Sequence, residues 1–258
     1  MPVLARPGGT ISYQVTGSGQ PPLLLTHGYG AAGAMFGQNL AAASVRNQVV
    51  TWDIRGHGGS ESPADPDSYS AGAALADMAA LLAELGLDRI VLGGHSLGGY
   101  LSLAFTLRHP EQVAGLVLIG TGPGFRNDAA RDDWNRRAHK TAERLEERGL
   151  AALGSSSELH GQHGDAGGLA LAARHTLTQR DSQVIDGLTT IHAPTLIIVG
   201  ADDTPFQGAA DYMTAKIPGA RKVVIPAAGH APNIDQPEQF DAELRAFLDD
   251  VAAAEEAA

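Results

Sequence analysis

The feature that most constrains the fold is a series of short, largely apolar runs, each followed by a turn that contains glycine. Apolar residues follow one another in these runs, whereas a strand with one solvated face alternates apolar and polar residues. Such runs are typical of strands that are covered on both faces, as in a parallel sheet. They are residues 23–26, 48–52, 89–93, 113–119, 194–199 and 221–225. Residues 10–15 instead predict a short edge strand that ends in a turn.

Helical patterns lie between the predicted strands. Asp235 is the predicted N-cap of the last helix, because Pro237 follows in its first turn and Glu238 lies three residues after the cap. The acidic, alanine-rich tail 251–258 is expected to fray. Alternating strands and helices predict the α/β class, with a doubly wound and mostly parallel sheet. The helical stripes, with apolar residues at steps of three and four, are residues 75–85, 97–105 and 240–248.

One segment, residues 124–187, interrupts this alternation, because it is densely charged and contains no convincing strand. Asn127 or Asp128 is the predicted cap of a helix that runs to about Arg148, and a second helical pattern follows. Connections in α/β units usually have about 2–6 residues, so this much longer segment predicts an inserted helical cap. The core would then comprise residues 1–123 and 188–258. The alternative is a helical hairpin that merely connects two strands.

Composition excludes several functions for this chain of 258 residues. Its 18 basic and 29 acidic side chains give a net charge of −11, which disfavours binding to nucleic acid or to an anionic membrane surface. The absence of cysteine excludes disulfides, thiolate metal ligands and a cysteine nucleophile. No apolar run approaches the roughly 20 residues of a membrane span, and residues 1–7 lack a secretory pattern. We therefore expect a cytoplasmic protein.

The strongest chemical signal is the sequence Gly94-His95-Ser96-Leu97-Gly98-Gly99. It follows a predicted strand and begins a predicted helix, which is the context that a nucleophile elbow requires. Glycines two residues to either side allow the strand and the helix to approach closely. The pattern predicts Ser96 as a nucleophile whose hydroxyl lies at the N-terminus of a helix.

A serine nucleophile needs a base, and the base needs a carboxylate that fixes its tautomer. Among ten histidines, His230 follows the last predicted strand, at the sheet edge where Ser96 is expected. Asp202 and Asp203 follow the predicted strand at 194–199, so we expect them at the same edge of the sheet. We select Asp203 as the partner of His230, with Asp202 expected to bond within the turn. The chain order Ser, Asp, His is the order associated with this elbow.

An oxyanion formed by attack of Ser96 needs two prearranged N–H donors. The backbone of Leu97, directly after the serine, is the first candidate. The second is the Tyr29 amide in the turn His27-Gly28-Tyr29-Gly30, which follows an early strand. His27 is expected to be a structural hydrogen-bonding residue.

These motifs, together with the turn at residues 53–60, resemble the α/β-hydrolase superfamily over residues 10–248. The resemblance implies the α/β-hydrolase fold and gives the turn at 53–60 a structural role. The short helical cap is similar to a group of cofactor-free esterases, enol-lactonases and carbon–carbon bond hydrolases. Serine at position 96, where dehalogenases and epoxide hydrolases of this superfamily carry aspartate, argues against those two chemistries.

The predicted function is hydrolysis of a small-molecule carboxylic ester or lactone through an acyl-enzyme, with no cofactor or metal. Two alternatives stay open: cleavage of a carbon–carbon bond in a vinylogous diketone, and a ligand receptor that retains the pocket without catalysis. Substrate identity and oligomeric state do not follow from the sequence. His160, His163 and Asp165 could ligate a metal ion, but they are expected to be solvated polar residues. The candidate substrate-binding residues are Phe125, Trp134 and Phe206.

Overall fold

The computed structural model describes residues 1–159 and 163–257. Eight strands form one sheet in the order β1-β2-β4-β3-β5-β6-β7-β8. β1 pairs with β2 and β2 with β4 in antiparallel fashion, and the other neighbours are parallel. This confirms the predicted α/β class and the mostly parallel sheet. The strands are β1 (Val3–Arg6), β2 (Gly9–Thr16), β3 (Leu23–Thr26), β4 (Val49–Trp52), β5 (Ile90–His95), β6 (Val113–Ile119), β7 (Thr195–Gly200) and β8 (Arg221–Ile225).

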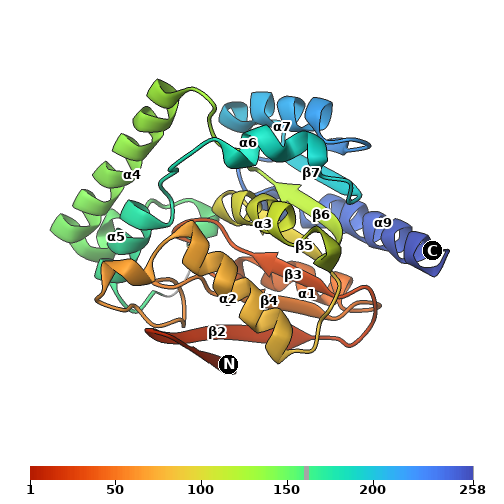
Figure 1. The fold of residues 1–258 in the computed structure, drawn as a ribbon, viewed down its shortest axis with the longest axis horizontal. Coiled ribbons are helices and arrows are strands. Elements are labelled where there is room, and N and C mark those ends of the chain that lie inside the picture. Colours follow the sequence, from red (N-terminus) through yellow and green to blue (C-terminus); the bar gives the residue numbers. More distant parts are fainter. Residues whose placement is uncertain (160–162, 258) are drawn as a thin grey trace.

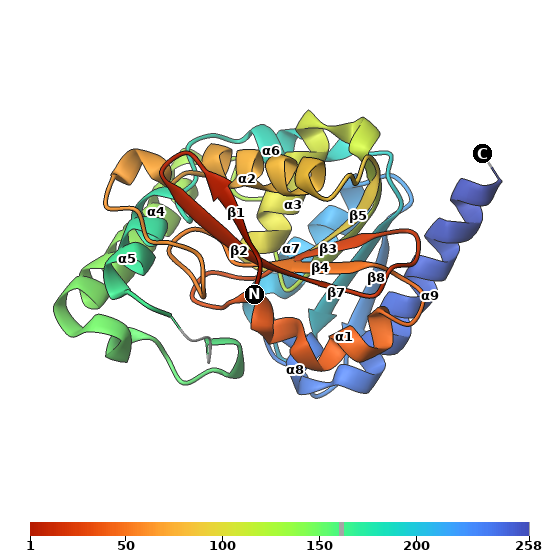
Figure 2. The same cartoon turned by 90° about the horizontal axis from the view of Figure 1, so that it is seen from below.

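Helices cover both faces of the sheet, as Figures 1 and 2 show. Apolar residues of α2, α3 and α7 pack on one face, and those of α1 and α9 pack on the other. The α-helices are α1 (Gly37–Ala43), α2 (Ala71–Glu84), α3 (Leu97–Arg108), α4 (Asp128–Arg148), α5 (Ala166–His175), α6 (Gln183–Gly187), α7 (Thr204–Lys216), α8 (Pro232–Asp235) and α9 (Pro237–Glu256). The short 3-10 helices are η1 (Gly33–Phe36), η2 (Pro66–Ser68), η3 (Pro110–Gln112), η4 (Gly149–Ala152), η5 (Ser157–Leu159) and η6 (Leu188–Thr190).

The unbroken apolar runs have the expected physical cause. Leu116 and Leu118 of β6 pack into the core on one face, whereas Val117 and Ile119 pack into the core on the other. Successive side chains of a strand point to opposite faces of the sheet. When helices cover both faces, the odd-numbered and the even-numbered residues of the strand must therefore both be apolar. The carboxyl ends of the parallel strands therefore meet at one edge of the sheet.

Residues 124–187, which the sequence assigns to a cap, contain α4, α5 and α6 and no strand among the positions that the structure describes. The Asn127 side chain caps α4 by accepting from the Ala130 amide at 3.0 Å, which makes it the cap among the two candidates from the sequence, Asn127 and Asp128. α4 and α5 pack on each other around a small apolar cluster of their own, beside the main body of the fold (Figure 1). α6 instead contacts α3 of the core.

Three local predictions were wrong. The edge strand is β1, which was not predicted, and the strand expected at the edge is second in the sheet. Asp235 does not cap α9, because it ends α8 and its carboxylate accepts from the Gly229 amide at 2.8 Å. The C-terminal tail is helical to Glu256 instead of frayed.

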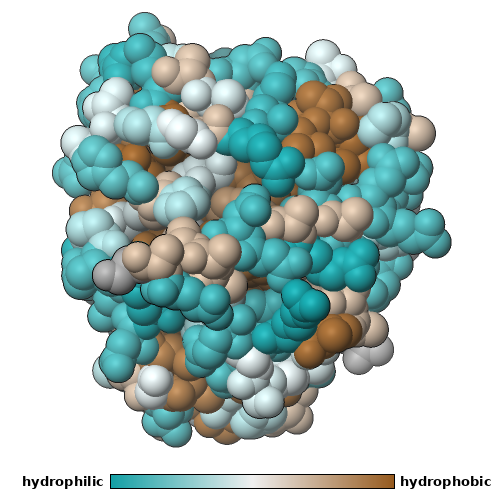
Figure 3. All heavy atoms as spheres, turned by 90° about the vertical axis from the view of Figure 1, so that its right-hand side faces the viewer, coloured by the Kyte–Doolittle hydropathy of each residue, from teal (hydrophilic) through white to brown (hydrophobic). Residues whose placement is uncertain are grey.

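The last helix buries its apolar stripe and exposes its polar residues. α9 packs Phe240, Leu244 and Phe247 against the sheet, and most of its polar residues face solvent. Figure 3 shows the face on the right-hand side of Figure 1 as mainly hydrophilic, with small separate hydrophobic patches. None of the helices in the described part of the chain is long and apolar enough to span a bilayer.

A buried ion-pair network connects the first strand to the core. The Asp77 carboxylate on α2 is 1% exposed and accepts from the Arg55 Nε at 2.6 Å and from the Arg55 Nη2 at 2.9 Å. Arg6 on β1 donates from Nε to the same carboxylate at 2.9 Å. Hydrogen bonding to Asp77 raises the pKa of Arg55. Asp77 thus holds two guanidinium groups, one of them almost fully buried.

Asp77→Ala should lower the free energy of unfolding by about 3–5 kcal/mol, because it leaves the buried Arg55 guanidinium without its carboxylate. Urea denaturation at neutral pH measures this loss. Asp249→Ala is the matched control, since it breaks the pair with Arg46 in which the side chains are 60% and 76% exposed. That change should cost no more than about 1 kcal/mol. Equal losses in the two variants would contradict the role assigned to Asp77.

Candidate active site

Ser96 lies in a strained turn between β5 and α3. Its φ of 51° and ψ of −113° are rare for a residue with a side chain, and strain of this kind is concentrated at functional sites. A Cβ atom on Gly94 would lie 2.2 Å from the Gly98 carbonyl, and one on Gly98 would lie 2.1 Å from the Thr26 carbonyl oxygen. Glycine at both positions is therefore required for β3, β5 and α3 to approach this closely. A tight strand-to-helix turn therefore surrounds Ser96, and its role as a nucleophile belongs to the proposal below.

Asp203 and His230 meet at the same edge of the sheet, from the loops after β7 and β8. The Asp203 Oδ2 lies 2.9 Å from the His230 Nδ1. Asp203 is 4% exposed, whereas Asp202 is exposed and bonds through its amide to the Ala228 carbonyl. A carboxylate at Nδ1 favours the tautomer with the proton on that nitrogen, which leaves Nε2 free to act as a base.

His95, the residue before Ser96, connects the serine turn to the His230 loop. Its Nε2–H donates to the His230 carbonyl at 2.9 Å, and the two rings lie 4.7 Å apart. Phe206 stacks on His230, with its ring centroid 4.7 Å from that of His230 and an angle of 27° between the planes. The His230 imidazole thus contacts both the His95 ring and the Phe206 ring.

Ser96 itself is half-buried, and across residues 1–159 and 163–257 its hydroxyl makes no hydrogen bond. The backbone around it is firmly fixed, because the Ser96 amide donates to the Ile119 carbonyl at 2.9 Å and the Thr121 hydroxyl donates to the Ser96 carbonyl at 2.6 Å. Catalytic hydrogen bonds are often long in ligand-free structures and tighten when substrate binds. The approach of Ser96 to His230 is therefore part of the proposal below.

The turn after β3 lies against the serine turn. A Cβ atom on Gly28 would be 3.2 Å from the Ser96 Cβ. His27 is buried and holds this turn, because its Nε2 accepts from the Ile54 amide at 2.9 Å and its Nδ1–H donates to the Gly28 carbonyl at 2.7 Å. That carbonyl belongs to the peptide that carries the Tyr29 N–H, so His27 fixes the plane of the candidate oxyanion donor. His27 has the structural role expected from the sequence.

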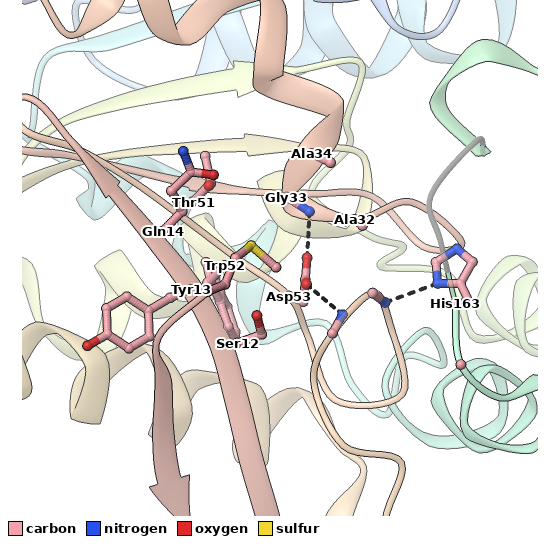
Figure 4. A pocket seen from close by; sticks show the side chains of 14 residues that line it. Ser12, Tyr13, Gln14, Ala32, Gly33, Ala34, Thr51, Trp52, Asp53 and His163 are labelled. Carbon is pink, nitrogen blue, oxygen red and sulfur yellow. Dashed lines mark hydrogen bonds between the residues drawn. The ribbon is translucent and has the colours of Figure 1, made fainter.

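The turn at residues 53–60 has a structural role here. The Asp53 carboxylate accepts from the Gly33 amide at 2.7 Å and from the Gly59 amide at 2.8 Å (Figure 4). These bonds form one wall of a cavity of about 700 Å³ between β2, β4 and the chain near His163. Ser96, Asp203 and His230 do not line this cavity, so it is distinct from the candidate active site.

The remaining predicted site residues lie in different environments. Phe125 and Trp134 have ring centroids 6.0 Å apart, and the Trp134 indole donates to the Leu177 carbonyl. His160 lies outside the described residues. Asp165 caps α5, and no group of three potential metal ligands forms in the part of the chain that the structure describes. The positions of Phe125 and Trp134 leave their role as substrate contacts a prediction.

Sequence reasoning missed the contacts that His95 and His163 make. His95 directly precedes Ser96, and its position at the end of a buried strand was a signal that its side chain could reach a neighbouring loop. His163 bonds to Gly30 and Gly58, more than 100 positions away in the chain. No local pattern could have shown that contact.

Three buried histidines, His27, His57 and His95, lie around the turns of Ser96 and Tyr29. Burial is the largest influence on the pKa of each of them, and it lowers all three pKa values. Desolvation lowers the pKa of His27 to about 4 and that of His95 to about 3. It also lowers the pKa of His57 well below the ordinary value. The folded protein therefore keeps these rings neutral at a pH where the unfolded chain, with a histidine pKa of about 6.5, binds protons.

The free energy of unfolding should accordingly be greatest above pH 6.5 and fall as the pH decreases toward the folded pKa values. Between pH 7 and pH 5, His27 and His95 should each contribute a loss of about 2 kcal/mol, and His57 should act in the same direction. Urea denaturation at several pH values measures this dependence. His27→Gln should remove about 2 kcal/mol of it. A free energy of unfolding that stays constant between pH 7 and pH 5 would contradict the assignment.

Comparisons with known proteins agree with this geometry. The model of the alpha/beta hydrolase family matches residues 23–243. The pimeloyl-[acyl-carrier protein] methyl ester esterase of Nitrosomonas europaea is 29% identical over an alignment of 255 residues, and the match covers 90% of this chain and 96% of that protein. The structure of a thermophilic esterase from Thermogutta terrifontis has a TM-score of 0.83 and 28% identity, and the match covers 96% of this chain and 97% of that one.

The structure of the enol-lactonase from Burkholderia xenovorans LB400 is also similar, with a TM-score of 0.77. It is 24% identical, and the match covers 96% of this chain and 99% of that chain, so this likeness shows the fold alone. The family match spans most of the sheet and both loops that carry Asp203 and His230. The chain therefore belongs to the alpha/beta hydrolase family.

Proposed function

We propose that this protein is a serine hydrolase that cleaves a small-molecule carboxylic ester or lactone through an acyl-enzyme. The observation that carries the proposal is the hydrogen bond of 2.9 Å between Asp203 and His230, next to the strained Ser96 turn. Family membership and relatives named as esterases support ester hydrolysis in general. The triad and the substrate class are inferences from the geometry and from this support.

In the proposed reaction, the Ser96 Oγ attacks the carbonyl carbon while the His230 Nε2 takes its proton. The amides of Tyr29 and Leu97 stabilise the negative charge on the carbonyl oxygen. His230 then returns the proton to the leaving oxygen as the carbon–oxygen bond breaks, which yields the acyl-enzyme. A water molecule attacks the acyl carbon, with His230 again taking and returning the proton, and the acid is released.

The environment of His230 suits this cycle. The buried Asp203 carboxylate stabilises the imidazolium that forms after each proton transfer. Stacking on Phe206 and the hydrogen bond from His95 to the His230 backbone restrict the motion of the loop. Restricted motion keeps the reacting groups close to their productive arrangement.

We further propose that residues 124–187 act as the cap, with Phe125, Trp134 and Phe206 contributing to the substrate pocket. Phe206 has the firmest basis of the three, because its ring contacts that of His230. Location in the cytoplasm stays a prediction from the sequence.

The reaction class is tested with a panel of p-nitrophenyl esters, lactones and vinylogous diketones. The wild type should hydrolyse esters or lactones, and Ser96→Ala should reduce kcat by at least about 10⁴-fold. Ser18→Ala, which changes an exposed serine between β2 and β3, is the matched control and should leave turnover unchanged. Turnover of diketones alone would favour the carbon–carbon hydrolase alternative. Ligand binding without any turnover above Ser96→Ala would favour the receptor.

The assignment of the acid is tested by two adjacent substitutions. Asp203→Asn should reduce kcat by about 10⁴-fold, because an amide at this position favours the wrong tautomer of His230. Asp202→Asn, one residue away and exposed, should change kcat by less than about threefold, because it lies outside the proposed triad. Steady-state kinetics on the best ester measure both. The reverse ranking of the two variants would transfer the role to Asp202.

A further inference from the structure

His163 lies in the connection between α4 and α5, and its imidazole reaches two loops of the core. The His163 Nδ1 accepts from the Gly58 amide at 3.1 Å, and its Nε2–H donates to the Gly30 carbonyl at 2.9 Å. Both bonds form only with the neutral tautomer that carries its proton on Nε2, because a backbone N–H needs an acceptor and a carbonyl needs a donor. Figure 4 shows the ring beside the turn that contains Asp53.

Gly30 is the last residue of the turn that carries the candidate oxyanion donor. It has a φ of 75°, and a Cβ atom there would lie 2.9 Å from the Leu159 side chain and 3.4 Å from that of Leu153. Its neighbour Tyr29 donates from its hydroxyl to the Leu169 carbonyl in α5 at 2.9 Å. Two consecutive residues of the turn therefore bond to the cap segment.

The turn is fixed at both ends by histidines. His27 donates to the Gly28 carbonyl, in the peptide that carries the Tyr29 N–H, and His163 donates to the Gly30 carbonyl two peptides later. His27 belongs to the core, whereas His163 belongs to the cap. The carbonyl groups before and after Tyr29 thus accept from one histidine of the core and one of the cap.

We propose that His163 is a positioning residue, through which the docked cap holds the Tyr29 amide in the orientation that stabilises the oxyanion. This inference rests on the proposed function. Oxyanion donors act on charge that develops in the transition state, so loss of their alignment lowers kcat more than it raises KM. A residue that only stabilised the fold would lower the melting temperature without that kinetic signature.

The test compares His163→Ala with His163→Gln in hydrolysis of p-nitrophenyl butyrate. A glutamine amide can accept from Gly58 through its oxygen and donate to Gly30 through its nitrogen, whereas alanine can do neither. His163→Ala should lower kcat roughly 10-fold or more while KM changes less than about twofold, and His163→Gln should restore kcat to within about threefold. His139→Ala, an exposed histidine on α4, is the matched control and should match the wild type.

A second measurement follows the labelling of Ser96 by a fluorophosphonate, in which the serine oxygen attacks phosphorus and fluoride leaves. The rate should fall in His163→Ala and recover in His163→Gln, because the phosphoryl oxygen also needs the oxyanion donors. If His163→Ala does not fold, His163→Asn is used, since its shorter amide cannot reach both partners. Wild-type kcat and labelling in folded His163→Ala or His163→Asn would overturn this inference alone. A wild type that neither hydrolyses esters nor is labelled would overturn the proposed function and this inference with it.

Discussion

The whole arrangement depends on the burial of a parallel sheet from both sides. Helices on each face require mostly apolar residues in the central strands, which leaves little room for reactive polar side chains within them. Such side chains are placed more readily where the strands end, and the parallel strands end at one edge. The turns after β3, β5, β7 and β8 carry Tyr29, Ser96, Asp203 and His230 to that edge. The same constraint that builds the core therefore gathers the candidate site.

Histidines determine much of the geometry at this edge, and each has a different task. His27 and His95 are buried and neutral, and they hold the backbone of the Gly28 and His230 loops by donating to carbonyl groups. His230 bonds to Asp203 and is the proposed base. Burial and hydrogen bonding thus give His27 and His95 an orienting role, which differs from the role proposed for His230.

Much of this could be predicted from the sequence, because the relevant signals are local. The apolar runs predicted the parallel strands, and Gly94 to Gly99 predicted the strained turn at Ser96. β1 was missed because its apolar run is only three residues long, Val3 to Ala5, and the strand alternates between exposed and half-buried residues. The tail was expected to fray although alanine and glutamate favour helices, and α9 continues through it. The roles of Asp235 and His163 depend on contacts across loops, which no pattern along the chain records.

The open ends of the sheet have a consequence for how copies of this protein meet one another. β1 and β8 each present an unpaired row of backbone groups, and such edges can recruit further strands. Arg6 lies at one edge, and Arg221 and Lys222 lie at the other, where Val224 is also exposed. These three cations are paired with Asp77, Glu243 and Asp211, so each border carries charged side chains of both signs. Charged side chains on edge strands disfavour edge-to-edge pairing with another sheet, and both borders of this sheet have them.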